Sequence, residues 1–419
     1  MLQIINPATE EVIRELAEDT PESIAEKFAK AKAAQKSWSK TPFATRKEAI
    51  ERFNELLQAN RQRLAETLTS EMGKPVGQAS GEVSATKGRI QFFLDETEKM
   101  LQADSMLVDS DGSDIPTLEE KITYEPLGVI GNISAWNYPY FVGTNVFIPA
   151  LLTGNAVLYK PSEHATLTGL AMAELLYEAG IPKDVFITVV GGGAAGAALL
   201  EQPLAGIFFT GSYGTGKKIA AAAAKQLMKV QLELGGKDPA YVCEDVEVKA
   251  AAEGLADGAF YNTGQSCCSV ERIYVHEKIY DEFVAHFKAT VEGFQVGSPT
   301  AEGAYIGPLT RKEQIPVIEA QIQDALDKGA TLLVGGKAIE GTGYYFQPTL
   351  LVDVNHNMEV MKEESFGPII GIQKVSNDEE ALELMNDTAY GLTSAVYTKD
   401  RERAAALLSE LQSGSAYWN

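Results

Sequence analysis

The feature that most constrains the fold is a regular alternation of apolar, strand-like runs with helical runs in the middle of the chain. Strand-like runs lie at residues 128–133, 156–160, 185–190, 206–209 and 229–233, and helical runs lie between them at 166–179, 194–201 and 214–227. Strands joined through helices pair in parallel, so the pattern predicts the βαβ units of a doubly wound sheet. A nucleotide is the ligand expected first at such a sheet.

The longest uncharged stretch belongs to the same region. No residue from Pro126 to Tyr159 is charged, but asparagines, prolines and glycines interrupt the stretch. It therefore predicts a buried α/β core and not a membrane span. The N-terminus, MLQIINPATEEVIRE, has polar and charged residues where a signal peptide needs an apolar run.

The charge balance excludes further classes of partner. The chain has 36 Lys and Arg against 58 Asp and Glu, a net charge of −22. A surface this acidic repels phosphate backbones and anionic lipid headgroups. We therefore expect neither a nucleic-acid partner nor a membrane partner.

The length of 419 residues is enough for two or three domains. The first hundred residues are mostly amphipathic helix, in which Thr20-Pro21 and Thr41-Pro42 each predict an N-cap followed by proline at the first helical position. Residues 103–120 are polar, acidic and turn-rich, which predicts a projecting loop or hairpin.

A second α/β series follows Gly235-Gly236 and predicts a separate domain. Its strands are expected near residues 239–242, 270–275, 331–334 and 366–374, and its helices near 247–261, 277–292, 312–328, 377–387 and 400–412. Residues 415–419 are expected to form a last strand that enters this domain.

The cysteines and histidines do not form a disulfide framework or a metal site. The three cysteines are Cys243, Cys267 and Cys268, and the four histidines are scattered without the spacing of metal ligands. We expect a reducing, cytoplasmic compartment and no metal. Cys243 lies inside the apolar run PAYVC and is expected to be an inert core thiol.

Two glycine-rich turns resemble phosphate-binding motifs only in part. Gly191 to Gly196, GGGAAG, fits the dinucleotide fingerprint but lacks the acidic residue expected about 20 positions later, which favours a plain strand-to-helix turn. Gly211 to Lys218, GSYGTGKK, nearly fits a P-loop, but Lys218 cannot supply the hydroxyl that holds magnesium. What remains is a helix N-terminus that attracts a phosphate of some nucleotide.

Two further segments have residue types suited to catalysis. In NTGQSCCSVER, residues 262–272, small and polar neighbours leave a thiol reachable, although a buried inert cysteine fits as well. In LELGGK, residues 232–237, Glu233 is either a solvated strand end or a general base to which the following glycines give room.

Six motifs stand in the order found in the aldehyde dehydrogenase superfamily, and the whole chain resembles that family. They are AWNYP at 135–139, YKPSE at 159–163, FTGS at 209–212, LELGGK at 232–237, GQSC at 264–267 and EESFGP at 363–368. The resemblance implies an α/β fold with two doubly wound parallel-sheet domains and a small projecting oligomerisation segment. It also implies oxidation of an aldehyde to a carboxylic acid with NAD(P)+.

The resemblance divides the chain as follows. Residues 1–107 and 127–234 correspond to the nucleotide-binding domain, residues 108–126 to the oligomerisation segment and residues 235–419 to the catalytic domain. Relatives continue beyond the final SGSAYWN, so the catalytic domain is expected to be C-terminally incomplete. The full-length protein is expected to be a homodimer or homotetramer. A truncated, catalytically impaired member that acts as a binding or structural protein is the alternative.

The resemblance assigns three catalytic residues. Cys267 matches the family nucleophile, and Cys268 is its neighbour. The Asn137 amide and the Cys267 N–H match the oxyanion hole of a reaction through a thiohemiacetal and a thioester. Glu233 matches the base that activates the hydrolytic water, which argues against the branch that passes the thioester to coenzyme A.

The resemblance also assigns the residues that bind the cofactor. A carboxylate at Glu163 hydrogen-bonds the ribose 2′-OH and repels a 2′-phosphate, so NAD is expected to be preferred over NADP. Glu364 and Phe366 match the residues that place the nicotinamide ribose and ring. The other expected cofactor residues are Trp136, Lys160, Ser162, Gly211, Ser212 and Gly216.

Overall fold

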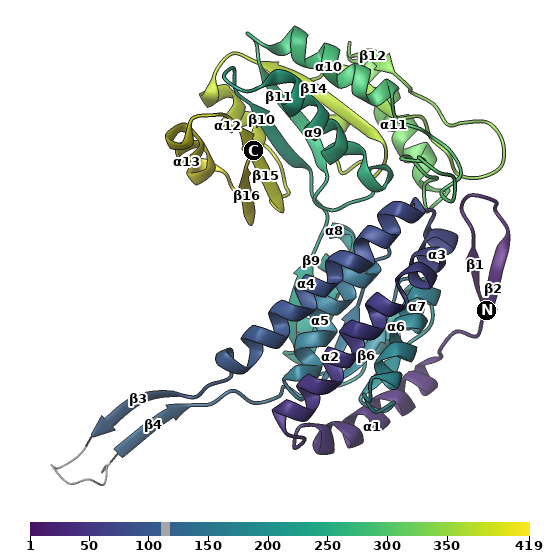
Figure 1. The fold of residues 1–419 in the computed structure, drawn as a ribbon, viewed down its shortest axis with the longest axis vertical. Helices are drawn as coiled ribbons and strands as arrows, with labels where there is room; N and C mark the ends of the chain where they lie inside the picture. Colours follow the sequence, from purple (N-terminus) through teal and green to yellow (C-terminus); the bar gives the residue numbers. More distant parts are fainter. Residues whose placement is uncertain (110–117) are drawn as a thin grey trace. The chain divides into compact units, whose positions relative to one another are not determined.

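The structure is a computed structural model that describes residues 1–109 and 118–419. The chain forms two compact units. Unit 1 contains Met1–Ile4, Glu15–Thr67 and Ser80–Glu233, and unit 2 contains Ile5–Arg14, Leu68–Ala79 and Leu234–Asn419. Each unit is built around one parallel sheet (Figure 1).

The sheet of unit 1 has five strands in the order β7-β6-β5-β8-β9, and all its neighbouring strands are parallel. The strands are β5 (Val129–Ile133), β6 (Ala156–Lys160), β7 (Phe186–Thr188), β8 (Gly206–Thr210) and β9 (Lys229–Glu233). The central β5 and the neighbouring β6 are buried along their whole length. The uncharged stretch is therefore core, as its composition predicted.

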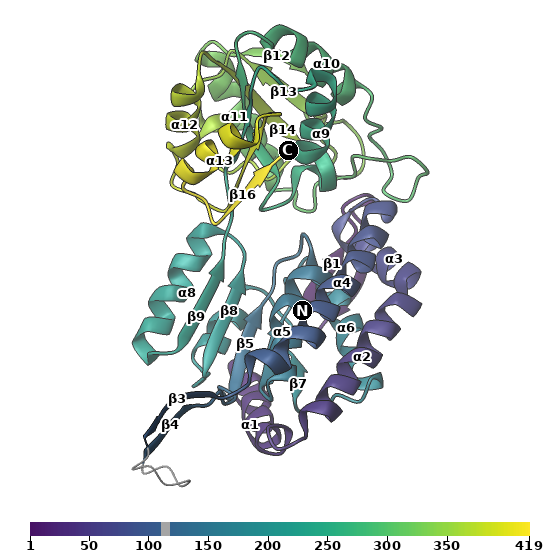
Figure 2. The same ribbon diagram turned by 60° about the vertical axis from the view of Figure 1, so that its left-hand side comes forward.

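Helices cover this sheet in two groups. On the N-terminal side of the chain, α1 packs against β6 and α7, and α2 packs against α5 and α6. Figure 2 shows α8 lying along β8 and β9. The helices are α1 (Pro21–Trp38), α2 (Phe43–Ala59), α3 (Arg61–Met72), α4 (Val76–Met100), α5 (Pro139–Leu152), α6 (Thr166–Glu178), α7 (Gly193–Leu200) and α8 (Tyr213–Gln226).

The predicted helix starts agree with the structure in one of the two cases. Thr20 caps α1, its side chain accepts a hydrogen bond from the Ser23 N–H, and Pro21 is the first helical residue. The prediction was wrong by one residue for α2, because Pro42 itself occupies the N-cap position and the helix begins at Phe43. Proline has no N–H and a fixed φ, so it is tolerated at either position.

Two antiparallel strands, β3 (Asp104–Asp109) and β4 (Leu118–Ile122), form the hairpin that the sequence allowed between residues 103 and 120. The predicted oligomerisation segment, 108–126, lies partly outside the described residues. A smaller two-stranded sheet joins β1 (Leu2–Ile5) to β2 (Val12–Leu16).

The sheet of unit 2 has seven strands in the order β12-β13-β14-β11-β10-β15-β16. It is parallel except for the antiparallel edge strand β12. The strands are β10 (Asp238–Val242), β11 (Val270–His276), β12 (Thr331–Val334), β13 (Thr349–Val352), β14 (Ile369–Val375), β15 (Thr393–Tyr397) and β16 (Ser415–Trp418). The predicted last strand is confirmed as β16, which pairs with β15.

A hydrophobic core lies on each face of this sheet. On one face, the sheet packs against α9 (Val248–Phe260) and α10 (Tyr280–Glu292). On the other face, it packs against α11 (Gln314–Asp327), α12 (Asp378–Asn386) and α13 (Arg401–Glu410). The sheet is thus covered on both sides, as in a doubly wound fold. Cys243 is fully buried in one of these cores, as expected of an inert thiol.

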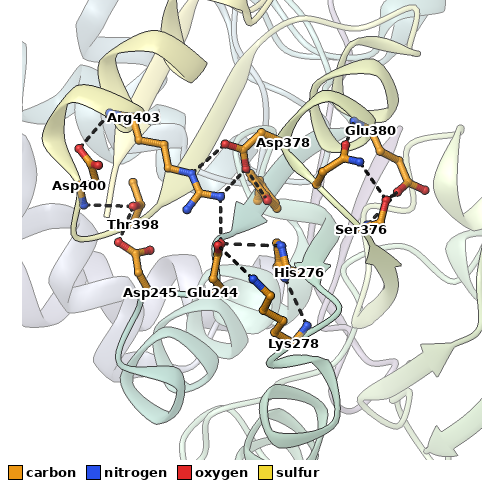
Figure 3. Close-up of polar contacts among 12 residues, drawn as sticks. Glu244, Asp245, His276, Lys278, Ser376, Asp378, Glu380, Thr398, Asp400 and Arg403 are labelled. Atoms are coloured by element: carbon orange, nitrogen blue, oxygen red, sulfur yellow. Dashed lines mark hydrogen bonds and ion pairs between the residues drawn. The ribbon is translucent and has the colours of Figure 1, made fainter.

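The carboxyl ends of the unit 2 strands are tied together by a polar cluster around Arg403 (Figure 3). The guanidinium of Arg403 donates to Asp378 at 2.5 and 2.8 Å and to Glu244 at 2.9 Å. Glu244 follows β10 and also lies 3.9 Å from the Nε2 atom of His276, the last residue of β11. The cluster therefore links α12 and α13 to two central strands.

Candidate active site

The predicted cofactor residues of unit 1 lie at the carboxyl ends of the central strands of its sheet, where the chain crosses from one side of β5 to the other. From the central β5, the chain first adds β6 and β7 on one side and then β8 and β9 on the other. Trp136 and Asn137 follow β5, Lys160 ends β6, and Gly211 and Ser212 follow β8. In open parallel sheets, the crevice at this switch point is where ligands bind.

Asn137 is held in the short connection between β5 and α5. Its side chain is 4% exposed. The start of α5 is fixed from two sides, because the N–H of Tyr140 donates to Glu82 at 2.9 Å and the Tyr140 hydroxyl donates to the Leu64 carbonyl at 2.8 Å. Trp136 packs edge-on against the ring of His164, with ring centroids 6.2 Å apart. A buried amide on a fixed turn is suited to donate to one defined position.

Lys160 and Glu163 form a polar pair at the end of β6. The ammonium of Lys160 lies 3.8 Å from a carboxylate oxygen of Glu163 and donates to the Pro161 carbonyl at 3.2 Å. Burial lowers the pKa of Lys160, while the charge of Glu163 opposes this shift. Burial opposes ionisation of Glu163, but the charge of Lys160 and nearby donors, including the Ser162 hydroxyl, hold its pKa below the usual value. Glu163 is therefore a carboxylate at neutral pH.

The turn after β8 presents a helix N-terminus. Ser212 is the N-cap of α8, and its side chain accepts a hydrogen bond from the Thr215 N–H at 3.4 Å. A methyl group placed on Gly214, in the first turn, would meet no atom within 4 Å, so the backbone there is open to a ligand. Free N–H groups and the helix dipole suit a phosphate. Together with a buried ammonium and a carboxylate, this donor set fits a dinucleotide.

The glycine-rich turn at residues 191–196 lies beside Lys160 and Glu163, although no role in binding was predicted for it. A methyl group on Gly192 would lie 3.9 Å from the Glu163 carboxylate, and one on Gly196 would lie 3.7 Å from the Lys160 side chain. The turn leads into α7 as a plain strand-to-helix connection, as predicted. Its small residues leave space next to the two charged side chains.

Glu233 is the last residue of the edge strand β9. Its carbonyl accepts the N–H of Gly211 at 3.0 Å, which fixes the backbone beside the phosphate-type turn. Its side chain is exposed within the structure and its carboxylate lies 3.5 Å from the Gln231 amide. Glu233 is thus an exposed carboxylate at a strand end, and its role as a general base stays a prediction.

In unit 2, Cys267 follows a tight loop between α9 and β11. Asn262, Thr263 and Gly264 all have left-handed backbone conformations, with φ of 52°, 59° and 70°. This conformation is costly for a β-branched residue such as Thr263, so the surrounding contacts must impose it. The Gln78 side chain accepts from the Asn262 N–H at 2.8 Å.

The remaining contacts of this loop fix the residues before the thiol. The Thr263 hydroxyl exchanges hydrogen bonds with the backbone of Gly307 at 3.1 and 3.3 Å. The Gln265 side chain accepts from the Thr310 N–H at 2.9 Å. A methyl group on Gly264 would overlap the carbonyl of Gly367, so glycine is required there both for its φ and for this close approach.

The two thiols of the motif are in contact. The sulfurs of Cys267 and Cys268 lie 3.9 Å apart, and the sulfur of Cys268 also lies 3.9 Å from the hydroxyl of Ser266. The contact with Cys268, together with burial, raises the pKa of Cys267. The contact with Cys267, joined by that with Ser266, lowers the pKa of Cys268 to about 6. The pair as a whole therefore loses its first proton more easily than an isolated thiol and its second far less easily.

Glu364 and Phe366 lie on the loop before β14. The Gly236 N–H donates to the Glu364 carboxylate at 3.2 Å, and burial, followed by the charge of Glu271, raises the pKa of Glu364 to about 7. Phe366 has a φ of 48°. The interpretation that Gly235 and Gly236 give Glu233 room stays a prediction. A second reason for glycine at position 235 is that a side chain there would overlap the Glu364 carboxylate.

Sequence reasoning missed one buried network in unit 2. Lys237 and Glu271 form an ion pair of 2.6 Å in which both residues are at most 5% exposed, and Lys237 also donates to the Ser365 hydroxyl at 2.9 Å. Glu271 comes four positions after Cys267, and Lys237 four positions after Glu233. Only their position inside the motifs could have pointed to them, since charged residues near a strand end are normally solvated.

The predicted site residues are therefore divided between the two units. Unit 1 contains Trp136, Asn137, Lys160, Ser162, Glu163, Gly211, Ser212, Gly216 and Glu233. Unit 2 contains Cys267, Glu364 and Phe366. Within residues 1–109 and 118–419, no group of three or more His, Cys, Asp or Glu side chains could hold a metal ion. No helix of the described part of the chain is long and apolar enough to cross a bilayer.

Comparison with known proteins gives a consistent result. The model of the aldehyde dehydrogenase family matches residues 1–419. The chain is 36% identical to 3,6-anhydro-alpha-L-galactose dehydrogenase of Vibrio sp. (strain EJY3), over 100% of this chain and 87% of that protein. It is 34% identical to lactaldehyde dehydrogenase of Escherichia coli (strain K12), again over 100% and 87%.

Solved structures agree with the sequence relatives. The crystal structure of an E. coli NADP-dependent enzyme superposes with a TM-score of 0.95 at 32% sequence identity, and covers 100% of this chain and 86% of that chain. The similarity extends over both units. The predicted α/β fold is thus confirmed.

Proposed function

The chain belongs to the aldehyde dehydrogenase family and oxidises an aldehyde with NAD(P)+, and we propose that it does so through Cys267, Asn137 and Glu233. The observation that carries the proposal is the rigid left-handed loop that precedes Cys267. It fixes the backbone before this partly exposed thiol and so supports a nucleophile at one defined position.

In the first step, the Cys267 thiolate attacks the carbonyl carbon of the aldehyde. A C–S bond forms, and the π electron pair of the carbonyl moves to its oxygen. The Asn137 amide and the Cys267 N–H donate to this oxyanion, and each such donor contributes about 3 kcal/mol in comparable sites. The resulting thiohemiacetal can release hydride because its carbon is tetrahedral and its oxygen is negatively charged.

Bound NAD(P)+ supplies the hydride acceptor, and oxidation leaves an acyl group on Cys267 as a thioester. Glu233 takes a proton from a water molecule, and the resulting hydroxide attacks the thioester carbon. The C–S bond then breaks, which releases the carboxylic acid and returns the thiolate of Cys267.

For the cofactor, we propose that Lys160, Ser162 and Glu163 hold the adenosine ribose, and that Gly211, Ser212 and Gly216 hold the pyrophosphate. Trp136 adds to this half of the site, and Glu364 and Phe366 place the nicotinamide half. The ionised Glu163 supports a preference for NAD over NADP. Some relatives are named as NADP enzymes, so this preference needs its own test.

We also propose that the segments of the chain have the separate functions that the sequence predicted. Residues 1–107 and 127–234 bind the nucleotide, residues 108–126 mediate oligomerisation and residues 235–419 bear the thiol. The protein works in the cytoplasm as a homodimer or homotetramer. Light scattering on the purified protein tests the assembly.

The decisive experiment separates the two chemical steps. Glu233→Gln should still form the thioester and release at most about one NADH per active site in a burst, after which turnover stops. Cys267→Ala should form no NADH, whereas Cys268→Ala should retain most of the activity. A panel of aldehydes with stopped-flow absorbance gives all three results.

Two other outcomes would change the interpretation. Loss of the burst in Glu233→Gln would mean that the carboxylate also deprotonates the thiol. If the wild-type chain binds NADH but oxidises no aldehyde, the alternative of an impaired member that acts as a binding protein would replace the proposal.

A further inference from the structure

Glu271 has no role in the chemistry described above, yet its carboxylate is among the most completely bound in unit 2. It lies near the start of β11 and is 5% exposed. One of its oxygens accepts from the Lys237 ammonium at 2.6 Å and from the Ser365 N–H at 2.8 Å. The other accepts from the Phe366 N–H at 3.1 Å. Two of its three donors are therefore main-chain amides of a single loop.

That loop contains both residues expected to place the nicotinamide half of the cofactor. Glu364 and Phe366 flank Ser365, whose own groups are all bound. The Ser365 hydroxyl donates to Gln321 at 2.7 Å, and its carbonyl accepts from Gln314 at 2.7 Å. The loop thus has a single, well-determined backbone path.

Glu271 holds the one residue of this loop that has a strained backbone conformation, Phe366. Phe366 has a φ of 48°, a conformation that costs free energy for a residue with a bulky side chain and persists only where the surroundings impose it. The hydrogen bond from the Phe366 N–H to Glu271 acts on that residue directly. Without an acceptor, the two buried amides would be unpaired and the loop would relax to other conformations.

Lys237 is the partner of the buried carboxylate of Glu271. Its ammonium lies 2.6 Å from a carboxylate oxygen of Glu271, and a buried carboxylate without such a partner costs free energy. Lys237 also donates to the Ser365 hydroxyl, so the same cation acts on the loop a second time. Lys237, Glu271 and the loop come from three of the sequence motifs, LELGGK, GQSCCSVER and EESFGP.

We propose that Glu271, balanced by Lys237, is a positioning residue of the enzyme: through the amides of Ser365 and Phe366 it holds Glu364 and Phe366 in the conformation that binds the nicotinamide end of the cofactor. This inference rests on the proposed cofactor role of Glu364 and Phe366. If the ion pair of Lys237 and Glu271 were purely structural, its loss would lower the stability of unit 2 but would not selectively weaken binding of the nicotinamide half of the cofactor.

The test compares NADH with ADP, which lacks both the nicotinamide ring and its ribose. In Glu271→Gln, the side-chain amide has a single acceptor oxygen, so one of the two main-chain amides loses its partner. We expect the Kd for NADH to rise about five- to tenfold, and the Kd for ADP to change less than about twofold. Fluorescence titration of NADH and calorimetry with ADP give the two constants.

A matched control is available at the opposite end of the same sheet. Asp378 is also a carboxylate bound by a cation, Arg403 (Figure 3), but it follows the carboxyl end of β14, whereas the loop of residues 363–368 precedes the amino end of that strand. Asp378→Asn should leave the ratio of the two dissociation constants unchanged. The double variant Lys237→Met/Glu271→Gln removes the buried charges together, and should show the same selective loss if Glu271→Gln does not fold.

The outcomes separate the inference from the proposed function. If wild type binds NADH and oxidises aldehydes, but the ratio of dissociation constants is the same in wild type and in the folded Glu271 variants, the positioning role is wrong and the function stands. Equal weakening of NADH and ADP also refutes the positioning role. If wild type itself fails to bind NADH, the proposed function fails first.

Discussion

At the scale of single residues, the pKa of Cys267 depends on its neighbour. The sulfurs of the two cysteines lie 3.9 Å apart, and Ser266 adds a contact to Cys268. The contact raises the pKa of Cys267 and lowers that of Cys268. This difference makes a prediction about pH.

Cys268→Ala should move the pH profile of Cys267 alkylation to lower pH, because the contact with Cys268 is the first cause that raises the pKa of Cys267. Alkylation of Cys267 by iodoacetamide at pH 7 should become several-fold faster. Cys268→Ser keeps a hydrogen-bonding group at this position and should shift the profile less. Cys243→Ala is the negative control, since that thiol is fully buried. An unchanged profile in Cys268→Ala would show that this contact does not set the pKa of Cys267.

Glu163 offers a second prediction at this scale. Its lowered pKa keeps a negative charge beside the expected ribose position. Glu163→Gln should therefore raise the NADP-to-NAD ratio of kcat/KM, by up to about 1–2 kcal/mol for one lost repulsion and hydrogen bond. Steady-state kinetics with both cofactors measures this ratio, and Glu174→Gln, an exposed change on α6, controls for net charge. A constant ratio would show that Glu163 does not face the ribose.

At the scale of elements, the loop at residues 262–264 is the most constrained connection described here. Gly264→Ala should lower the free energy of unfolding by about 2 kcal/mol or more. A positive φ is strained for alanine, and its methyl group would overlap the Gly367 carbonyl. Gly297→Ala is the matched control, since a methyl group there meets nothing within 4 Å. Urea denaturation checks both variants, and equal stability of the two would contradict the assignment.

The Arg403 cluster predicts a pH-dependent stability. Burial opposes ionisation of Asp378 and Glu244, but the hydrogen bonds and charge of Arg403 prevail and hold both pKa values below their ordinary 3.8 and 4.5. Lowered carboxyl pKa values stabilise the folded state above these values, and this stabilisation is lost as the pH falls through the folded-state values.

Arg403→Met should therefore lower stability at pH 7 by about 1–3 kcal/mol, and the difference from wild type should shrink below about pH 4. Urea denaturation at pH 7, 5 and 3.5 measures it. Arg401→Met, an exposed change at the start of α13, should stay within about 0.5 kcal/mol of wild type. A difference that is constant with pH would mean that Arg403 acts through packing alone.

At the scale of the whole molecule, each unit has its own sheet and cores, and each has its own part of the expected cofactor set. ADP should accordingly slow hydrogen exchange at residues 160–163 and 211–216 of unit 1 and leave the 363–368 loop unchanged. NADH should protect that loop as well. Mass spectrometry of hydrogen exchange distinguishes the two patterns, and protection of the loop by ADP would contradict the division of the cofactor residues.

Much of this architecture could be predicted from the sequence. The alternation of strands and helices between residues 128 and 233 predicted the first sheet, because period and length are local properties. The prediction of the second sheet was less complete. The strands β13 and β15 were not predicted, since apolar runs of four and five residues among loops do not stand out. The strand expected at 366–374 begins at Ile369, because the residues before it form the loop held by Glu271.

By itself, the sequence determined the α/β class and the order of the six motifs, and with them the family, while the role of Cys267 stays a prediction. Only the tertiary structure decided how these residues are held. The left-handed φ of Phe366 and the need for glycine at 264 depend on contacts with residues about a hundred positions away. The same is true of Glu271, whose main-chain donors lie 94 and 95 positions along the chain. Such contacts leave no local period in a sequence, since they arise only once the sheet of unit 2 has formed and polar groups must find partners inside it.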